Sequence, residues 1–117
     1  MTKSTAVPPT QLPATIRRYL AAHAAGDADT ALRAFTATAT VVDEGRTYRG
    51  TQEIDDFLRH AGSAYTYTTE LVGAARVDDV HWVATQRLVG NFPGGIAELA
   101  YRFTMSDDLI DALVIAP

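Results

Sequence analysis

Apolar residues recur every three to four positions between Pro13 and Gly26, which is the spacing of an amphipathic helix. Proline is tolerated in the first turn of a helix, and glycine is favoured in the left-handed position just past its end. Asp27 then suits the N-cap of a short second helix. The apolar stripe of the first helix is Ile16, Tyr19, Leu20, His23 and Ala24, and that of the second is Ala31, Leu32 and Phe35.

The apolar period changes from helical to alternating at Ala37, which predicts a strand that runs to Asp43. Ala39, Val41 and Asp43 fall on one face of this strand. A carboxylate therefore stands where the alternation would place an apolar residue. Glu44-Gly45 directly afterwards predicts a turn.

The rest of the chain predicts a third helix and a series of strands. Thr51 suits the cap of a helix that carries the apolar stripe Ile54, Phe57 and Leu58 and ends at Gly62. Breaks rich in Asp, Gly and Pro separate strand-like segments at residues 46–49, 64–75, 80–92, 96–105 and 109–115. Three helices followed by a meander predict an α+β domain, in which a curved antiparallel sheet wraps around the three N-terminal helices.

The register of the last two strands can be predicted from their loop. A two-residue loop at Ser106-Asp107 would place Arg102 opposite Asp111, a favourable pair of charges. One face would then carry Leu99, Tyr101, Phe103, Met105, Ile110, Ala112 and Val114, and the other Ile96, Ala100, Leu109, Leu113 and Ile115. Since both faces are apolar, we expect the outer face to be covered by a second copy of the chain, in a homodimer.

Composition narrows the class of protein. The 117 residues fit a single domain, which we place at residues 13–117 after a flexible N-terminal arm, residues 1–12. The arm has no apolar segment like that of a secretory signal, and no run in the chain is long enough to span a membrane. The absence of cysteine suits a reducing cytoplasm, and a net charge of −4 argues against nucleic-acid binding. His60 and His81 have no spacing that suggests a metal site.

Asp43 and Tyr19 are the candidate catalytic residues, because the two periodicities aim both at one interior. An apolar interior would deprive Asp43 of hydration and raise its pKa, so that it could take and return a proton as a general acid–base. The alternative is a strand-end carboxylate that is solvated or capped by nearby N–H groups. Tyr19 could donate a hydrogen bond to a ligand oxygen, or it could be a core aromatic whose hydroxyl reaches a backbone carbonyl.

Other side chains on the expected inner faces are candidates for ligand contact. If Trp82 and every second residue after it face inward, Gln86 is a polar group in an apolar lining and could orient a ligand carbonyl or hydroxyl. Gln86 could equally bond a buried backbone group, and His23 fits a core histidine better than a catalyst. The candidate ligand-binding residues are Trp82, Gln86, Tyr101, Leu99, Phe57 and His23, and Tyr65, Tyr67 and Tyr101 could form either cavity wall or plain core.

Three segments resemble the nuclear transport factor 2-like superfamily, which includes the SnoaL-like polyketide cyclases and bacterial ketosteroid isomerase. They are Tyr19-Leu-Ala-Ala-His-Ala-Ala-Gly26-Asp27, Phe35-Thr-Ala-Thr-Ala39-Thr-Val41-Val-Asp43, and Tyr48-Arg-Gly50 followed by Ile54 and Phe57. The resemblance implies a cone-shaped α+β fold. In the isomerase a helix tyrosine donates to the substrate oxygen and a strand-end aspartate moves the proton, and Tyr19 and Asp43 match these positions. Leu99 stands where the isomerase has a protonated aspartate as second donor, and it cannot donate.

Pattern and resemblance together predict a small cytoplasmic homodimer whose cone holds an apolar small molecule. Asp43 and Tyr19 would promote a proton shift next to a carbonyl group: an isomerisation, an aldol-type cyclisation or a dehydration. Such a step needs a base, a donor for the oxyanion and a dry pocket, so no metal or organic cofactor is implied. The alternative is a non-catalytic ligand-binding or dimerisation module of the same fold.

Overall fold

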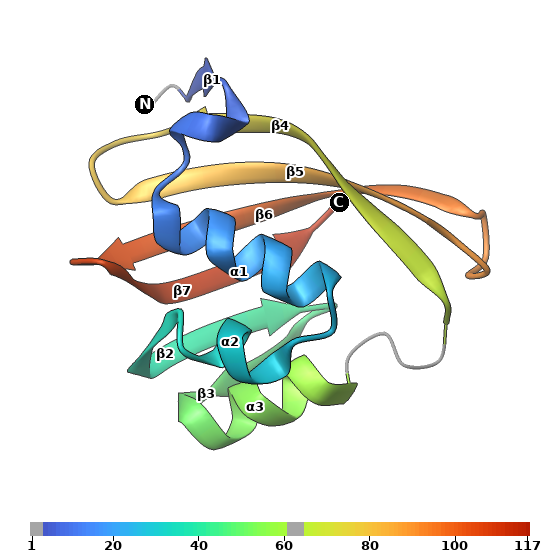
Figure 1. Ribbon diagram of the computed structural model, residues 1–117, viewed down its shortest axis with the longest axis horizontal. Coiled ribbons are helices and arrows are strands. Elements are labelled where there is room, and N and C mark those ends of the chain that lie inside the picture. The colour runs from blue at the N-terminus through green and yellow to red at the C-terminus, as the bar shows by residue number, and fades with distance from the viewer. Residues whose placement is uncertain (1–3, 61–64) are drawn as a thin grey trace.

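A curved, unclosed sheet of seven strands wraps around three α-helices in the computed structural model, which describes residues 4–60 and 65–117 (Figure 1). This confirms the α+β class expected from the sequence. The helices lie on the concave face of the sheet, and α1 runs across its centre. The helices are α1 (Ala14–Ala24), α2 (Ala28–Leu32) and α3 (Gly50–His60), and a short 3-10 turn, η1, spans Pro9–Gln11.

The strands follow one another in the sheet in the order β1-β4-β5-β6-β7-β2-β3. All neighbours are antiparallel except β2 and β7, which are parallel. The sequence predicted a wholly antiparallel sheet, but the last strand returns beside the first long one and runs in the same direction. The strands are β1 (Thr5–Val7), β2 (Phe35–Asp43), β3 (Arg46–Arg49), β4 (Tyr67–Arg76), β5 (His81–Gly90), β6 (Ile96–Ser106) and β7 (Leu109–Ala116).

Local rules explain how the chain reaches the end of β2. Gly26 has a φ of +72° and ends α1, and the Asp27 carboxylate accepts a hydrogen bond from the Thr30 N–H at 3.1 Å and so caps α2. Glu44 and Gly45 both have positive φ, as the two central residues of a type I′ hairpin require. Asp43 therefore lies at the last pair of the β2–β3 ladder.

The β6–β7 hairpin differs from the register that the sequence predicted. Ser106 pairs with Leu109, so that the turn falls on Asp107-Asp108, and Asp107 adopts a φ of +52°. A bulge follows between the pairs Thr104↔Ala112 and Met105↔Ile110, which shifts the later residues of β7 by one position. Arg102 is therefore opposite Val114 and not Asp111, which instead accepts a hydrogen bond from the Thr36 hydroxyl at 2.8 Å.

The bulge also reverses the predicted faces of β7. Leu113 and Ile115 were expected on the outer face, but both are buried in the core, whereas Val114 is exposed. Because side chains alternate along a strand, a shift of one residue moves every later side chain to the other face. The outer face consequently presents less apolar surface than the sequence suggested.

The N-terminal segment before α1 carries secondary structure of its own. Thr5–Val7 forms an edge strand on β4, with Thr5 opposite Arg76, and Leu12 is buried at 2% exposure. Leu12 also accepts a hydrogen bond from the Arg17 side chain at 3.0 Å. Residues 1–3 of the predicted arm, the predicted helix end at Gly62 and the predicted strand start at Ala64 lie outside the described residues.

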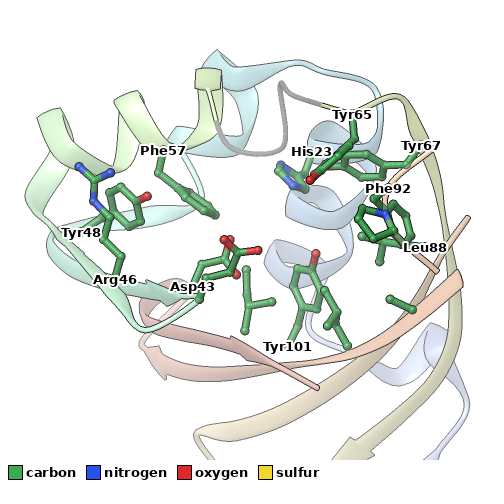
Figure 2. A pocket seen from close by; sticks show the side chains of 15 residues that line it. His23, Asp43, Arg46, Tyr48, Phe57, Tyr65, Tyr67, Leu88, Phe92 and Tyr101 are labelled. Carbon is green, nitrogen blue, oxygen red and sulfur yellow. The ribbon is translucent and has the colours of Figure 1, made fainter. Parts of the chain in front are cut away.

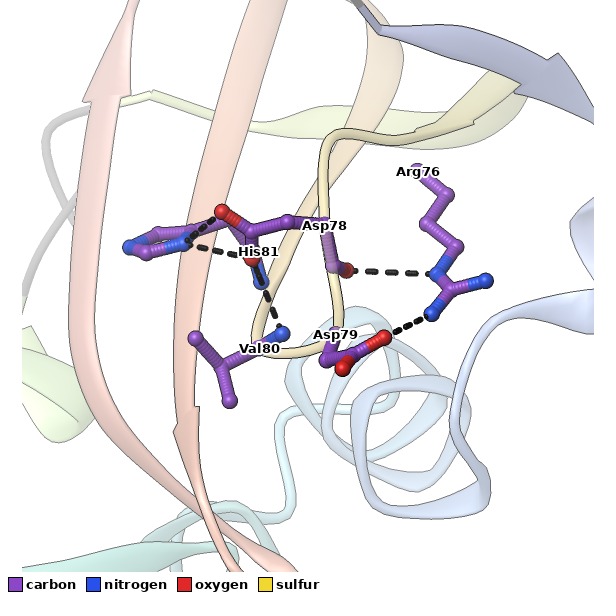
Figure 3. A network of polar contacts seen from close by, with 5 residues as sticks. All are labelled: Arg76, Asp78, Asp79, Val80 and His81. Carbon is purple, nitrogen blue, oxygen red and sulfur yellow. Dashed lines mark hydrogen bonds and ion pairs between the residues drawn. The ribbon is translucent and has the colours of Figure 1, made fainter. Parts of the chain in front are cut away.

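The β4–β5 turn is held by a network of charged side chains (Figure 3). The Asp78 carboxylate accepts hydrogen bonds from the backbone N–H groups of Val80 and His81, and it lies 2.8 Å from His81 Nδ1. The Arg76 guanidinium donates to the Asp78 carbonyl and pairs with the Asp79 carboxylate. Asp78-Asp79 thus forms the turn that the sequence predicted.

The core lies between the helices and the concave face of the sheet. It is built from Leu12, Ile16, Tyr19, Leu20, Ala22, Ala31, Ala34, Phe35, Ala39, Val41, Ile54, Phe57, Ala84, Tyr101, Phe103, Met105, Ile110, Leu113 and Ile115. Within the described parts of the chain, none of the helices is long and apolar enough to cross a membrane.

Candidate functional site

A cavity of about 580 Å³ opens between α1, α3 and the inner face of the sheet (Figure 2). This volume lies within the range of small-molecule sites, about 300–1,000 Å³. The side chains that line it are His23, Asp43, Glu44, Arg46, Tyr48, Phe57, Tyr65, Tyr67, Leu88, Phe92, Pro93, Ala97, Leu99, Tyr101 and Ile115. The wall is thus largely aromatic and aliphatic, with a few charged groups on one side.

Asp43 points into this cavity from the end of β2. Burial raises the pKa of the carboxyl above its ordinary value, and the neighbouring Glu44 carboxylate raises it further. A hydrogen bond from the Glu44 backbone acts in the opposite direction. Because the loss of hydration dominates, the carboxyl is easier to protonate than that of a free aspartate.

Tyr101 points into the same cavity from β6. Burial raises the pKa of its hydroxyl to about 12, and the charges of Tyr67 and Asp43 make smaller contributions in the same direction. Hydrogen bonding to Gln86 lowers this pKa slightly. Burial and the Asp43 charge also raise the pKa of Tyr67 on β4. Both phenols therefore remain protonated at neutral pH and can donate hydrogen bonds beside the carboxyl.

Tyr19 lies behind the cavity and does not line it. Its ring is fully buried, edge-on to Phe35 at 5.3 Å and to Phe103 at 5.9 Å between centroids. Within residues 4–60 and 65–117, no group hydrogen-bonds to its hydroxyl. Burial raises its pKa well above the ordinary value, and charges at Tyr101, Asp43 and Tyr67 raise it further, so the hydroxyl belongs to the same cluster of groups.

His23 joins Tyr19 to the cavity wall. Its ring stacks on Tyr19 at 5.7 Å and on Phe57 at 6.4 Å, within about 10° of parallel to each. Burial lowers the pKa of the imidazole, so that the neutral form is favoured at neutral pH. His23 is therefore an uncharged aromatic part of the wall.

The described residues bring no three His, Asp or Glu side chains together in an arrangement that could hold a metal ion. The groups of the cavity that suit acid–base chemistry are the Asp43 carboxyl and the phenols of Tyr67 and Tyr101, with the Tyr19 hydroxyl behind them. A carboxyl that protonates easily, beside hydroxyls that can donate to an oxygen, can move a proton on a bound carbonyl compound.

Only the comparison with solved structures finds proteins that are similar to this chain. None of the family models and none of the curated proteins match the sequence. A candidate polyketide cyclase from Sinorhizobium meliloti superposes with a TM-score of 0.86 at 29% identity, over 94% of this chain and 100% of that one. The chain has the SnoaL-like, nuclear transport factor 2-like fold.

Two more distant structures share this SnoaL-like fold. The Δ5-3-ketosteroid isomerase of a Mycobacterium species superposes with a TM-score of 0.71 at 14% identity, over 89% of this chain and 90% of the isomerase. An NTF2-like protein from Cytophaga hutchinsonii gives a TM-score of 0.70 at 8% identity, over 87% of this chain and 85% of that one. At these identities the likeness concerns the fold.

The SnoaL-like fold brings some of the predicted ligand-binding residues to the cavity and separates others from it. Tyr101, Leu99, Phe57 and His23 line the cavity together with Asp43. The Gln86 side chain is on the inner face of the sheet but is only 3% exposed. It hydrogen-bonds to Tyr101, which lines the cavity, so Gln86 lies behind the cavity wall.

Trp82 also faces inward, but it lies at the other end of β5, away from the cavity. It pairs with Phe103, and the Arg76 guanidinium lies 5.6 Å from its ring centre. The alternation along β5 therefore identified the inner face correctly but did not show how deep in the cone each residue lies. A strand of ten residues spans about 30 Å, longer than a small-molecule cavity.

Sequence reasoning missed several lining residues. Leu88 follows Gln86 in the same alternation, so its inward position could have been recognised. Glu44 lies in the turn between β2 and β3, and Arg46 and Tyr48 follow it on β3. Phe92 was included in the predicted strand 80–92, but β5 ends at Gly90, so Phe92 lies in the following loop and the alternation does not fix its direction. Loop residues such as this one can be found only in three dimensions.

Proposed function

We propose that this chain is a small-molecule enzyme that moves a proton next to a carbonyl group, with Asp43 as the general acid–base. The observation that carries this proposal is a carboxyl of raised pKa in a largely apolar cavity, beside phenols that stay protonated. A base is most useful when its pKa lies near the working pH, and the shift of Asp43 is in that direction.

In the proposed reaction, the Asp43 carboxylate takes a proton from the carbon next to the carbonyl. Negative charge then develops on the carbonyl oxygen, which accepts a hydrogen bond from a phenol. Asp43, now a carboxylic acid, returns the proton to another carbon in an isomerisation, to a leaving hydroxyl in a dehydration, or, in an aldol-type cyclisation, to the alkoxide that forms when the carbon attacks a second carbonyl group. Isomerisation, aldol-type cyclisation and dehydration share this step and differ in where the proton goes. A base, a donor and a cavity that limits water are sufficient for it.

The resemblance assigns the donor role to Tyr19, and we propose that Tyr101 shares it. Tyr101 lines the cavity directly, whereas Tyr19 is reached only behind His23 and the cavity wall. The Tyr19 hydroxyl has no hydrogen-bond partner among the described residues, which leaves it available to an oxygen that penetrates to that depth. Leu99 lines the cavity but offers no second acid, so a tyrosine is the stronger candidate for the second donor.

The experiment follows hydrogen–deuterium exchange by NMR in a panel of apolar cyclic ketones and enones incubated with the protein in D₂O. The wild type should accelerate exchange at the carbon next to the carbonyl in at least one member. Asp43→Asn, which keeps the shape of the side chain, should lose the acceleration. The control is Glu70→Gln, which should retain it, because Glu70 is exposed on β4 opposite Arg87, on the outer face of the sheet. Equal exchange by wild type and Asp43→Asn would refute the proposed role of Asp43.

A second candidate is a non-catalytic ligand-binding protein, and the observation that favours it is the apolar Leu99 in the cavity wall. Losing one oxyanion donor typically costs about 10²–10³ in rate, so the missing acid at this position weakens catalysis without weakening the binding of an apolar ligand. If the protein only binds ligands, some members of the panel should bind to it, but the protein should not accelerate hydrogen–deuterium exchange in any of them.

We also propose that the outer face of the sheet binds a second copy of the chain. The large apolar residues exposed on that face are Val72, Val89, Ile96, Leu109 and Val114. Exposed apolar groups distributed over one face favour association, although the burial of Leu113 and Ile115 makes this face less apolar than the sequence indicated.

A further inference from the structure

Six aromatic side chains among the described residues surround the cavity: Tyr48, Phe57, Tyr65, Tyr67, Phe92 and Tyr101. They come from separate elements on different sides of it. Tyr48 and Phe57 lie next to Asp43, with ring centres 4.9 Å apart, and Tyr65 and Phe92 lie across the cavity and form an edge-to-face pair at 6.2 Å (Figure 2). A molecule bound here would be in contact with ring surfaces on several sides.

The charged groups of the wall favour a positive ligand. Asp43 and Glu44 contribute two carboxylates, and burial lowers the pKa of His23 so that it is neutral at neutral pH. Arg46 is the one lysine or arginine of the described residues that lines the cavity. It is exposed, and its guanidinium lies 4.9 Å from the centre of the Tyr48 ring, so that an aromatic face of this wall already attracts a cation.

We propose that the cavity binds an organic cation, a substituted ammonium group held among the aromatic rings with Glu44 as its counter-ion. The inference deepens the proposed function, on which it rests for the use of this cavity as the substrate site. The substrate class is then a carbonyl compound that also carries an ammonium group. Aromatic rings attract cations through the negative charge on their faces, and clusters of such rings are used to recognise substituted ammonium groups.

The lining side chains become less exposed with depth in the cavity, and this difference indicates where each end of such a ligand would bind. Glu44 and Tyr65 are exposed and Tyr67 is half-buried, whereas Tyr101 is 4% exposed. The ammonium group belongs at this exposed outer end, between Glu44 on one side of the cavity and Tyr65 on the other. The carbonyl end belongs deeper, between Asp43 and Tyr101, where a proton could be moved. An ammonium group at the outer end also leaves Asp43 free to act as the base.

The test compares choline with 3,3-dimethylbutan-1-ol, which has the same shape but carries carbon in place of the charged nitrogen. Both are titrated at pH 7 into ¹⁵N-labelled protein and followed through backbone amide shifts. Choline should shift the signals of residues 43–48 and of Tyr65 and should bind at least about fivefold more tightly, since charge adds cation–π attraction to equal apolar contact. Equal affinity for the two compounds, or choline shifts confined to the outer face of the sheet, would overturn the inference.

Variants separate the contribution of charge from that of the rings. Glu44→Gln should weaken choline binding about threefold without affecting the alcohol, and Glu70→Gln on the outer face should change neither. Tyr65→Phe should keep most of the choline affinity, whereas Tyr65→Leu should lower it about threefold. If Glu44→Gln and Tyr65→Leu both bind choline as the wild type does, the inference is wrong.

The outcomes also distinguish this inference from the proposed function. Failure of choline to bind, together with Asp43-dependent hydrogen exchange on neutral ketones, would overturn the cation site and leave the proton-transfer role intact. Preferential choline binding without hydrogen exchange on any carbonyl compound would support the cation site and refute the catalytic role.

Discussion

Asp43 and Tyr101 are both paired with Ile115, from opposite sides. Asp43 is opposite Ile115 in the parallel β2–β7 ladder, and Tyr101 is opposite it in the antiparallel β6–β7 ladder. Their backbones are thus two strand spacings apart, about 10 Å, on the same face of the sheet. Ile115 forms an apolar floor between the carboxyl and the phenol, and a small carbonyl group above this floor could reach both.

Replacing the two buried tyrosines by phenylalanine should distinguish their roles. Tyr19→Phe should raise the free energy of unfolding by about 1 kcal/mol, because it removes a buried hydroxyl that has no hydrogen-bond partner in the described residues. Tyr101→Phe should leave stability within about 1 kcal/mol but lower the rate of hydrogen exchange by about 10²-fold if it is the main donor. Urea unfolding and the exchange assay measure these quantities. A strong loss of stability in Tyr19→Phe would mean that its hydroxyl is satisfied in solution.

The shifted register of β7 predicts that substitutions at two neighbouring residues differ strongly in their cost to stability. Leu113→Ala should destabilise the protein by about 2–5 kcal/mol, because Leu113 is fully buried in the core. Val114→Ala should cost less than about 1 kcal/mol, because Val114 is 39% exposed on the outer face. Denaturant unfolding of both variants gives the comparison. If Val114→Ala were the more damaging change, the register without the bulge would be correct.

The proposed homodimer predicts a mass of about twice the 12.6 kDa of the chain in sedimentation equilibrium at micromolar protein concentration. Val114→Asp should shift the equilibrium toward monomer, because it places a charge on the exposed outer face without entering the core. Asp79→Asn, in the β4–β5 turn, is the control and should leave the mass unchanged. A monomeric wild type at these concentrations would refute the proposed use of the outer face.

Stability should depend on pH through Asp43. Because its pKa is raised in the folded protein, the folded state holds this proton more tightly than the unfolded state does. The free energy of unfolding should therefore fall as pH rises from the ordinary aspartate pKa of about 3.9 through the folded value, and this contribution then stays constant. The Asp43→Asn variant has no carboxyl that must ionise in the cavity, so its free energy of unfolding does not fall in this way. It should therefore be more stable than the wild type at pH 7, by at most about 1 kcal/mol.

The difference in the free energy of unfolding between Asp43→Asn and the wild type, measured at each pH, cancels the contributions of the other titrating groups. His23, whose pKa is lowered, makes both proteins less stable as the pH falls below its ordinary value of about 6.5, and this effect cancels in the difference. The advantage of Asp43→Asn should shrink toward pH 3. An Asp43→Asn protein that is strongly destabilised at pH 7 would show that the carboxylate is a structural group.

Local rules were enough to predict much of the path to the site. Gly26, Asp27 and Glu44-Gly45 each occupy the position that their conformational preferences predict, and alternation along β2 correctly placed Ala39 and Val41 in the core. These features depend on a few consecutive residues. The sequence therefore contained enough information to place Asp43 at the end of an inward-facing strand.

Features that depend on distant contacts could not be predicted in this way. The bulge in the β6–β7 hairpin moves Leu113 into the core, and nothing in the alternation of β7 indicates an extra residue. Trp82 has the inward direction that was expected but lies beyond the cavity, because periodicity gives the face of a strand and not the depth along the cone. The position of Tyr19 behind His23 likewise depends on how α1 packs on the sheet.

The titration of the Asp43 carboxyl tests the central claim most directly, because the proposed chemistry requires a carboxyl that protonates more easily than a free aspartate. Carbon-detected NMR of the side-chain carboxyl, assigned with Asp43→Asn, would follow its chemical shift with pH. We expect a pKa clearly above the ordinary value of about 3.9, because burial in the cavity disfavours the charged form. A pKa at or below that value would mean that Asp43 is solvated or ion-paired, which would contradict its proposed role as the acid–base residue.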